Sequence, residues 1–282
     1  MLVFTSASEL CAALPSSNNN TIGLVPTMGA LHQGHLTLID KARSENANVV
    51  VSIFVNPTQF NRPEDLEKYP KNLTQDLQTL APYSKNLFVF APTVEEIYPH
   101  GLITNAYEFG SLTQFMEGRY REGHFNGVAT VVESLFRKIR PYRAYFGEKD
   151  FQQLQIIKTL AKQIDFKVEI VSCPIIRDND GLAMSSRNSL LSPIERKAAA
   201  KIYKALNTVA TILNTDDVEE MERYFYTIIK AQPELEIEYF CIAEPENLIP
   251  VRTLIKEKKY RLFTAVYAGK TRLIDTLELH RK

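Results

Sequence analysis

The sequence predicts an α/β protein with an open, doubly wound, largely parallel sheet, followed by a smaller α+β domain. Apolar runs rich in β-branched residues alternate with helical patterns up to residue 171. The run at residues 49–55 is apolar on both faces, which is typical of a strand in a parallel sheet covered on both sides. After residue 177 the order changes, and two helical stretches precede three strand-like runs.

The elements of the first part follow one another in a regular order. We expect the first strand at residues 22–25, ending at Pro26 because proline cannot continue a central strand. A helix follows over residues 35–44, with its apolar side chains at helical spacing. The remaining expected elements are helices at 73–80, 128–139 and 151–164 and strands at 49–55, 87–90, 142–146 and 167–171.

The second part reads as helices followed by strands, which is typical of an α+β domain. We expect helices at about 193–213 and 218–230 and strands at 237–242, 262–267 and 272–277. The predicted division therefore gives one domain over residues 1–177 and another over 178–282. Residues 16–20 (SSNNN) are expected to form a polar turn.

Composition limits the possible partners and compartments. Lys+Arg and Asp+Glu both number 33 in 282 residues, so the chain lacks the broad positive field of nucleic-acid and anionic-membrane binders. The cysteines at 11, 173 and 241 are widely spaced and read as buried thiols in a reducing compartment. The N-terminus has no basic flank typical of a signal peptide, and no apolar run approaches the ~20 residues of a membrane span. We expect a cytoplasmic protein.

The segment MGALHQGH at residues 28–35 lies between the first expected strand and its helix. Glycines permit a tight turn there, and the start of a helix offers N–H groups to an anion. His32 and His35 lie three residues apart on one helical face and can donate hydrogen bonds to phosphate oxygens. A glycine-rich turn with two surface histidines is the alternative. The position between strand and helix favours a nucleotide-phosphate site, and the lack of a nearby third ligand disfavours zinc.

Other polar segments follow later strands or lie in loops, and each has an ordinary alternative. MSSR at 184–187 could clamp a triphosphate or be common loop material. GEKD at 147–150 places Lys149 near a strand end, or simply caps a helix through Asp150. NPTQF at 56–60 offers amides to a polar substrate, or forms a turn. The segment at 117–125 could bind an anion or be a charged surface loop.

Taken together, six segments in a fixed order resemble the pantothenate synthetase (pantoate–β-alanine ligase) family. The histidine and MSSR segments alone would indicate only the wider superfamily of adenylating enzymes, whereas NPTQF and GEKDFQQ are narrower. The resemblance covers nearly the whole chain through PTMGALHQGH, VSIFVNPTQF, the Tyr-Pro at 69, EGRYREGHFNGVATVV, YFGEKDFQQL and PIIRDNDGLAMSSRN. The sequence departs from the family pattern at Glu122, where proline is usual, and at Met116.

The resemblance implies a fold and a reaction. It implies a Rossmann-like N-terminal domain that binds ATP and pantoate, a smaller C-terminal lid, and a homodimer. ATP and (R)-pantoate would give pantoyl adenylate and pyrophosphate with Mg²⁺. β-Alanine would then attack the adenylate to give pantothenate and AMP.

The resemblance also implies roles for individual residues. His35 would be the catalytic proton donor, assisted by His32, Lys149 and Arg187. The implied ATP contacts are Met28, Gly29, Ala30, Leu31, His32, Gln33, Gly34, His35, Gly147, Glu148, Lys149, Asp150, Ile176, Met184, Ser185, Ser186 and Arg187. The implied substrate contacts are Gln59 and Gln153, with supporting positions at Asn56, Glu117 and Arg121. Asp76 would help to hold the metal.

Three rival functions remain open at this point. Nucleotidyl transfer onto a phosphorylated acceptor would need no amine. A synthetase acting on tRNA would be expected to carry a basic, RNA-binding appendage. A metabolite-binding protein without catalysis could retain the same fold.

Overall fold

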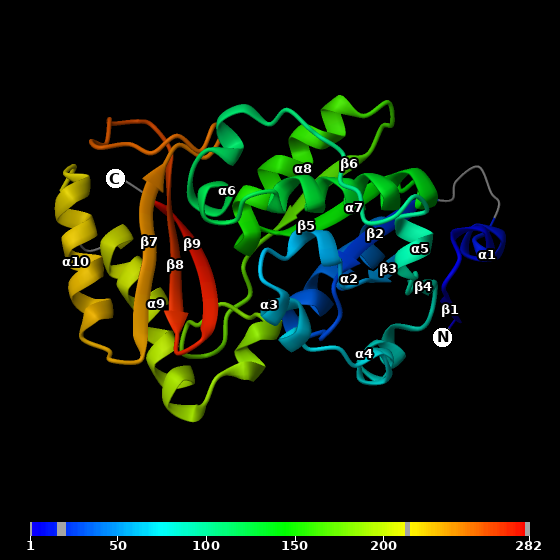
Figure 1. Ribbon diagram of the computed structural model, residues 1–282, viewed down its shortest axis with the longest axis horizontal. Coiled ribbons are helices and arrows are strands. Elements are labelled where there is room, and N and C mark those ends of the chain that lie inside the picture. Colours follow the sequence, from blue (N-terminus) through cyan, green and yellow to red (C-terminus); the bar gives the residue numbers. More distant parts are fainter. Residues whose placement is uncertain (1, 16–20, 212–214, 280–282) are drawn as a thin grey trace. The chain divides into compact units, whose positions relative to one another are not determined.

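The computed structural model describes residues 2–15, 21–211 and 215–279 and divides into two compact units (Figure 1). The N-terminal unit comprises Met1–Phe109, Arg121–Gly147 and Gln153–Pro174. The C-terminal unit comprises Gly110–Tyr120, Glu148–Gln152 and Ile175–Lys282. Two short internal segments thus belong to the C-terminal unit, which a single boundary does not anticipate. The assignment of functions to residues 1–177 and 178–282 stays a prediction.

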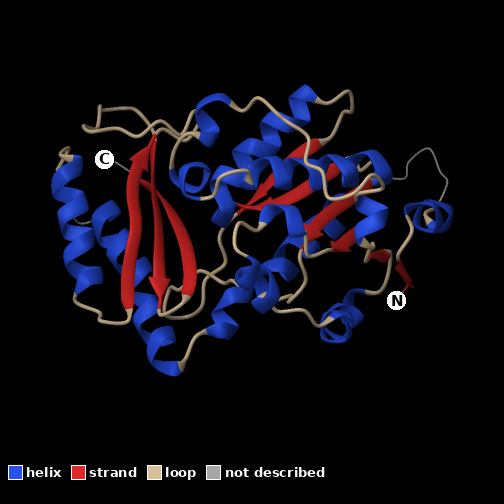
Figure 2. Cartoon of the chain, in the orientation of Figure 1, coloured by secondary structure: helices blue, strands red, loops and turns tan. Residues whose placement is uncertain are grey.

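A six-stranded sheet forms the centre of the N-terminal unit (Figure 2). Its order is β1-β4-β3-β2-β5-β6, and every neighbouring pair is parallel. The order reverses between β2 and β5, as in doubly wound folds. The strands are β1 (Leu2–Phe4), β2 (Ile22–Thr27), β3 (Asn48–Ile53), β4 (Leu87–Phe90), β5 (Arg143–Gly147) and β6 (Glu169–Cys173).

Helices surround this sheet and share its core. Ile39 and Ala42 of α2 and Leu80 of α4 are fully buried in one cluster with Val49 and Val51 of β3. Each of the buried Val, Leu and Ile side chains contributes about 1.5–3 kcal/mol through its removal from water. The helices of this unit are α1 (Ala7–Ala13), α2 (Gln33–Glu45), α3 (Pro63–Lys68), α4 (Leu73–Leu80), α5 (Val94–Ile97), α7 (His124–Ile139) and α8 (Phe151–Gln163), whose first two residues belong to the C-terminal unit.

The expected end of the first strand, at Val25, is wrong. Strand β2 continues through Pro26, which pairs in register with Ser52 of β3. On its other side β2 pairs with β5 through Gly23 and Leu24, so Pro26 lies beyond that pairing. The missing N–H of proline is costly only where a neighbour would accept it, which explains why proline is tolerated here.

The C-terminal unit has a three-stranded antiparallel sheet of order β7-β8-β9. Buried apolar residues of α9 and α10, such as Ile202 and Phe225, form one cluster with Leu262 and Val266 of β8. This arrangement confirms the expected α+β domain. Its elements are α6 (Met116–Tyr120), α9 (Pro193–Thr211), α10 (Val218–Lys230), β7 (Leu235–Ala243), β8 (Tyr260–Ala268) and β9 (Thr271–Leu279).

Some minor expectations differ from the structure or lie outside it. The cysteines are not uniformly buried, because Cys11 is exposed while Cys173 is buried and Cys241 half-buried. Burial raises the pKa of the Cys241 thiol to about 12. The polar turn at residues 16–20 and the last two residues of the helix expected at 193–213 lie outside the described residues. Within the described ranges, no helix is both long and apolar enough to cross a membrane.

Candidate active site

The residues singled out by the sequence fall into two sets, one in each unit. The N-terminal unit holds residues 28–35, Asn56, Gln59, Asp76, Arg121, Gly147 and Gln153. The C-terminal unit holds Glu117, residues 148–150, Ile176 and residues 184–187. Within each unit the structure gives definite contacts for many of these side chains.

The loop after β2 lies at the carboxyl end of the sheet, next to the reversal of strand order. In open parallel sheets this edge is where ligands bind. The backbone turns there through two consecutive left-handed residues, Gly29 with φ 79° and Ala30 with φ 50°. The left-handed conformation costs about 1–2 kcal/mol for a residue such as alanine. An outside contact must therefore hold the turn in place.

Asp76 of α4 supplies that contact. Its Oδ2 accepts the N–H of Ala30 at 3.0 Å and its Oδ1 accepts the N–H of Leu31 at 2.7 Å. The side chain is only 2% exposed, and a Cβ placed at Gly29 would lie 2.8 Å from Oδ2. Burial raises the pKa of Asp76, although the two backbone donors partly oppose this shift. The carboxylate therefore fixes the shape of the loop that leads into α2.

The two histidines are held by the start of α2 itself. His32 is the N-cap, and its Nδ1 accepts the N–H of Gly34 at 3.1 Å. The Nδ1 of His35 accepts the N–H of His32 at 3.3 Å. An acceptor nitrogen carries no proton, so each neutral ring has its N–H at Nε2, on the far side from the helix backbone. The rings lie 4.1 Å apart, and this closeness disfavours two positive charges.

The orientation of the Gln59 side chain is set by the main chain of α7. The carbonyl of Gly127 can only accept, so the atom of Asn56 that faces it at 3.1 Å must be Nδ2. The same Nδ2 donates to Oε1 of Gln59 at 3.2 Å. The amide of Gln59 is thereby fixed, and its Nε2 points towards Sδ of Met28. Tyr98 completes the chain by donating its hydroxyl proton to Oδ1 of Asn56 at 2.5 Å.

Arg121 and His124 hold the backbone of the same glutamine. Nη2 of Arg121 lies 3.1 Å from the carbonyl oxygen of Gln59, and Nδ1 of His124 lies 2.8 Å from it. Nη1 of Arg121 and Nε2 of His124 are 3.0 Å apart. Gln59 and His124 are both buried. Arg121, which is predicted to support substrate binding, therefore also bonds the backbone of Gln59, the predicted substrate ligand.

The predicted phosphate residues of the C-terminal unit lie on turns. Lys149, on the turn after β5, has its Nζ 3.6 Å from Oδ1 of Asp150. Glu148 makes an ion pair with Arg261 at 3.1 Å. Ile176 accepts the N–H of Met184 at 2.9 Å, which closes the loop between them. Ser185 caps the turn Ser186–Leu190 by accepting the N–H of Arg187 at 3.3 Å. These contacts bring residues 176 and 184–187 into one loop.

Glu117 is engaged by partners of its own unit. Arg272 of β9 donates to both carboxylate oxygens, at 2.7 and 2.8 Å, and Tyr239 donates its hydroxyl proton to Oε1 at 2.8 Å. Arg272 also bonds Glu238. Although burial lowers the pKa of Arg272, the two carboxylates raise it above its ordinary value. Glu117 anchors α6 to the sheet, and a direct contact to substrate stays a prediction.

The side chains that could bind a metal ion are few in the described part of the chain. Among the described residues, no cluster of three or more His, Cys, Asp or Glu side chains could hold a metal ion. Mg²⁺ commonly binds through one or two carboxylates, waters and substrate phosphates, so it does not require such a cluster. Asp76 has a lone pair left on each oxygen beyond its backbone contact. Its role as a metal ligand stays a prediction.

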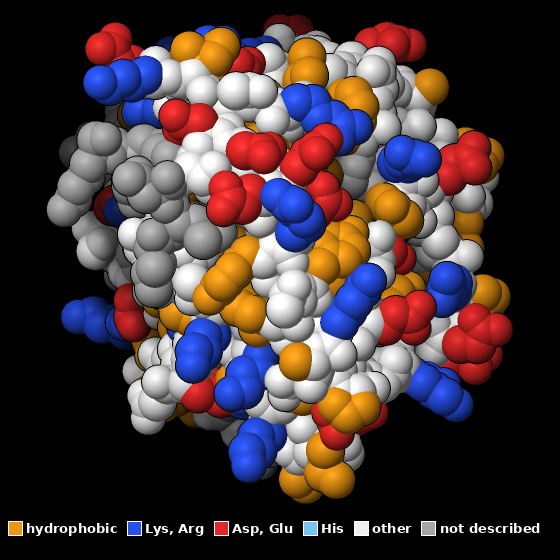
Figure 3. Space-filling model, turned by 90° about the vertical axis from the view of Figure 1, so that its left-hand side faces the viewer, with side chains coloured by type: hydrophobic (Ala, Val, Ile, Leu, Met, Phe, Trp, Pro, Cys, Tyr) orange, Lys and Arg blue, Asp and Glu red, His pale blue; other side chains and the backbone are white. Residues whose placement is uncertain are grey.

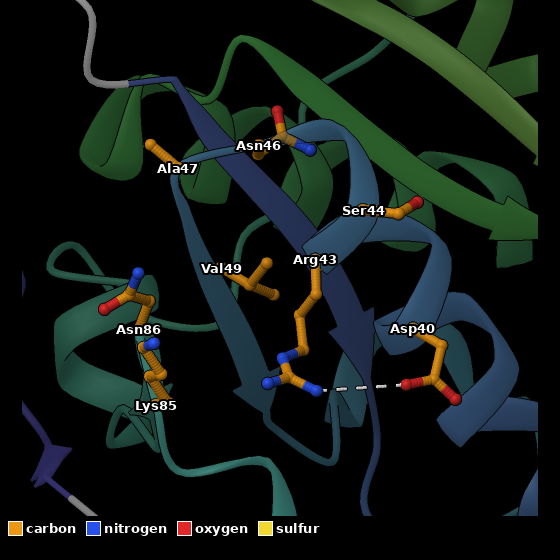
Figure 4. Close-up of a pocket in the computed structure, with 8 residues that line it drawn as sticks. All are labelled: Asp40, Arg43, Ser44, Asn46, Ala47, Val49, Lys85 and Asn86. Atoms are coloured by element: carbon orange, nitrogen blue, oxygen red, sulfur yellow. Dashed lines mark ion pairs between the residues drawn. The ribbon is translucent and has the colours of Figure 1, made fainter.

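A pocket of about 410 Å³ lies elsewhere in the N-terminal unit (Figure 4). Arg43 and Asp40 of α2 line one side, with their charged atoms 4.0 Å apart, and Lys85 and Asn86 line another. Asn86 immediately precedes β4, so this pocket is at the amino end of the strands. Ligands of such sheets bind at the opposite, carboxyl end, and the pocket therefore is not our candidate site.

Comparison with known proteins identifies the family. The profile of pantoate–β-alanine ligases matches residues 2–278. A pantothenate synthetase from Christiangramia forsetii is 47% identical over 282 residues, which cover 99% of this chain and all of the relative.

The chain belongs to the pantoate–β-alanine ligase family.

Solved structures of the family agree with this fold. The crystal structure of pantothenate synthetase from Thermus thermophilus has a TM-score of 0.91 and 43% identity, with both chains fully covered. A pantoate–β-alanine ligase from Francisella tularensis, described as complexed with β,γ-ATP and β-alanine, has a TM-score of 0.82 and 36% identity over 100% of this chain and 99% of its own. The expected fold class, ligase activity and role in pantothenate synthesis are thereby confirmed.

Sequence reasoning missed several side chains that position this ligase's candidate residues. Tyr98, His124 and Arg272 each act on a predicted residue that is distant along the chain. His124 lies inside a segment that the sequence had singled out, but its contact to residue 59 had no sequence signal. A buried histidine cannot be distinguished from an exposed one by spacing alone.

Proposed function

We propose that this ligase uses ATP to condense (R)-pantoate with β-alanine, giving pantothenate, AMP and pyrophosphate through a pantoyl adenylate. The observation that carries the proposal is the histidine pair at the start of α2, with each Nδ1 engaged by a backbone N–H. Each neutral ring then carries its proton on Nε2, an N–H of the kind that can donate to phosphate oxygens. The helix start adds a partial positive charge that favours an anion there.

In the proposed first step, a carboxylate oxygen of pantoate attacks the α-phosphorus of ATP. The bond from that phosphorus to the bridging oxygen breaks, and pyrophosphate leaves. Negative charge increases on the phosphate oxygens, and His32, His35, Lys149 and Arg187 would stabilise it. The remaining ATP contacts are proposed at the other residues of 28–35, at 147–150, at Ile176 and at 184–186.

In the proposed second step, the amine of β-alanine attacks the acyl carbon of the adenylate. The carbon–oxygen bond to AMP breaks, the amine loses its additional proton, and the amide of pantothenate forms. Gln59 and Gln153 would bind the substrates, with Asn56, Glu117 and Arg121 in support. Because Nε2 of Gln59 is its oriented donor, it suits an oxygen of pantoate or β-alanine.

Mg²⁺ bound with ATP would neutralise phosphate charge, and Asp76 is the protein ligand proposed for it. Support for the nucleotide and the amine comes from the Francisella tularensis ligase, whose description names β,γ-ATP and β-alanine. We further propose that residues 178–282 act as a lid, that the protein is a homodimer and that it works in the cytoplasm. Nucleic acid and membranes are not proposed as partners. On the face drawn in Figure 3, acidic and basic side chains are intermixed.

Two assays on the purified full-length protein test the function. Pantoate-dependent exchange of labelled pyrophosphate into ATP reports the first step, and β-alanine-dependent AMP release reports the second. Exchange without AMP release on adding β-alanine would point to another amine acceptor. Pantoate-independent activity with a phosphorylated acceptor would favour nucleotidyl transfer. A folded protein without either activity would favour a binding protein.

A further inference from the structure

His124 lies at the junction of two residues that the proposed function assigns to substrate. It is the first residue of α7, after Gly123, whose φ of 76° turns the chain into the helix. Its ring contacts the carbonyl oxygen of Gln59 through Nδ1 and the guanidinium of Arg121 through Nε2. Arg121 also donates to the same carbonyl oxygen, so the three residues form a closed triangle.

The partners of His124 determine its protonation. A carbonyl oxygen only accepts hydrogen bonds, so Nδ1 must carry a proton. A guanidinium only donates, so Nε2 must present a lone pair. The ring is therefore neutral, with its proton on Nδ1, which is the opposite tautomer from that of His32 and His35. A protonated ring would place an N–H and a positive charge against Arg121.

Two members of the triangle, Gln59 and His124, are buried and Arg121 is half-buried, which makes the contacts between them costly to lose. The side chain of His124 is 5% exposed, and its ring packs against Phe125 at 5.0 Å between ring centres. Gln59 is 8% exposed. Removing one partner of a buried hydrogen bond is costly, because the other partner stays away from water.

We propose that His124 is a positioning residue that fixes the backbone of Gln59 and the guanidinium of Arg121 for the binding of pantoate and β-alanine. It acts through these two residues and does not itself touch substrate. The inference rests on the proposed function, which gives Gln59 and Arg121 their substrate roles. Gln59 reaches the ATP segment through its side-chain amide at Met28, whereas His124 holds the carbonyl oxygen of Gln59, so ATP binding should depend on His124 much less than pantoate binding does.

Three variants separate the two contacts of the ring. His124→Phe keeps the approximate size and removes both contacts. His124→Gln carries its amide at the place of Nε2 and can accept from Arg121. His124→Asn carries a donor at the place of Nδ1 and can still bond Gln59. His100→Phe is the matched control, because His100 is exposed in the same unit.

Steady-state kinetics of the full-length enzyme gives the first test. We expect His124→Phe to raise KM for pantoate by about tenfold or more, because both contacts of the ring are lost. KM for ATP should stay within about twofold of the wild type, because residue 124 is not one of the proposed ATP contacts. His124→Asn should recover most of the loss, and His100→Phe should match the wild type. Equal increases in both KM values, or an Asn variant no better than Phe, would overturn the proposal.

A second measurement is independent of activity. The ring nitrogens of the chain's five histidines can be observed by ¹⁵N NMR, and the spectrum of His124→Asn identifies the signals of residue 124. We expect a neutral ring with its proton on Nδ1 at neutral pH. A cationic ring, or a proton on Nε2, would overturn the assignment even if the enzyme were active. Conversely, a wild type without pantoate-dependent exchange would reject the proposed function while the NMR result still tests the triangle.

Discussion

The side chains in and around the loop before α2 differ in how far the sequence could predict their contacts. The sequence singled out His32 and His35 as a phosphate site, because glycines and a strand–helix junction surround them, and that role stays a prediction. Asp76 was expected as a metal ligand, yet it also bonds the backbone of Ala30 and Leu31. That contact joins positions 45 and 46 residues apart, so no local pattern could reveal it.

Removing the imidazole of His35 should affect catalysis more than ATP binding. We expect His35→Ala to lower the rate of adenylate formation by about 10²–10³-fold, as for loss of one oriented donor to transition-state charge. The dissociation constant for ATP should change far less, because charge on the phosphates increases only during reaction. Single-turnover kinetics and calorimetry measure the two quantities, with His100→Ala as control. Equal losses in rate and affinity would contradict the role.

Replacing Asp76 by asparagine should change how stability depends on pH. Burial raises the pKa of Asp76 above 3.8, so the folded state holds this proton more tightly than the unfolded state. Its contribution to the free energy of unfolding is then complete below about pH 3.8 and is lost as pH rises through the folded pKa. Urea unfolding should therefore show the wild type losing stability relative to Asp76→Asn as pH rises above about 4. A relative gain over that range would contradict the direction of the shift.

At the scale of elements, some segments were predicted with their observed bounds and others were not readable from the sequence. The helices at 73–80 and 218–230 and the strand at 87–90 were predicted with their observed bounds. β1 has three residues, with Leu2 and Val3 exposed, and so offers no readable alternation. α6 is five residues long, and its position depends on Glu117 bonding Arg272, which is 155 residues away. A contact between residues so distant along the chain cannot be predicted from a local sequence pattern.

The ion pair that anchors α6 should stabilise the C-terminal unit measurably. Arg272→Met would leave the carboxylates of Glu117 and Glu238 next to each other without a cation. We expect the free energy of unfolding to fall by about 3–5 kcal/mol, as for a broken buried pair. Adding Glu117→Gln should recover part of this loss, because one uncompensated charge disappears. Denaturant unfolding of the single and double variants measures both effects.

An exposed ion pair of the same unit provides the control. Lys258 lies 2.7 Å from Glu244, and its side chain is 50% exposed. Lys258→Met should cost less than about 1 kcal/mol, because solvent screens the pair. Similar losses for Lys258→Met and Arg272→Met would show that burial does not distinguish the two pairs.

At the scale of the whole molecule, the division into two units was only partly predictable. The change from an alternating pattern to helices followed by strands predicted a boundary after residue 177, and the last segment of the C-terminal unit is Ile175–Lys282. The membership of residues 110–120 and 148–152 in that unit was not readable, because each segment is too short to show its own pattern. The candidate residues of GEKD thus span a boundary that the sequence placed 30 residues later.

Metal removal should stop the reaction without unfolding the chain. Since the described residues hold no cluster of metal ligands, EDTA should leave the thermal midpoint of the ATP-free protein unchanged within about 1 °C. Activity should disappear with EDTA and return on adding Mg²⁺. MgATP at 100 times its dissociation constant should add about 2.7 kcal/mol of stability by mass action. A large drop in midpoint with EDTA alone would instead indicate a structural metal.

The carbonyl of Gly127 has a consequence for how the family can vary. A side chain can be exchanged by a single mutation, whereas a main-chain oxygen persists whatever residue occupies the position. Such an oxygen sets the orientation of the Asn56 amide, and through it that of the Gln59 amide. Position 127 itself has no room for a side chain, because a Cβ there would lie 2.4 Å from the carbonyl oxygen of Thr58. The orientation of the Gln59 amide should therefore persist through substitutions elsewhere in α7 as long as position 127 remains glycine.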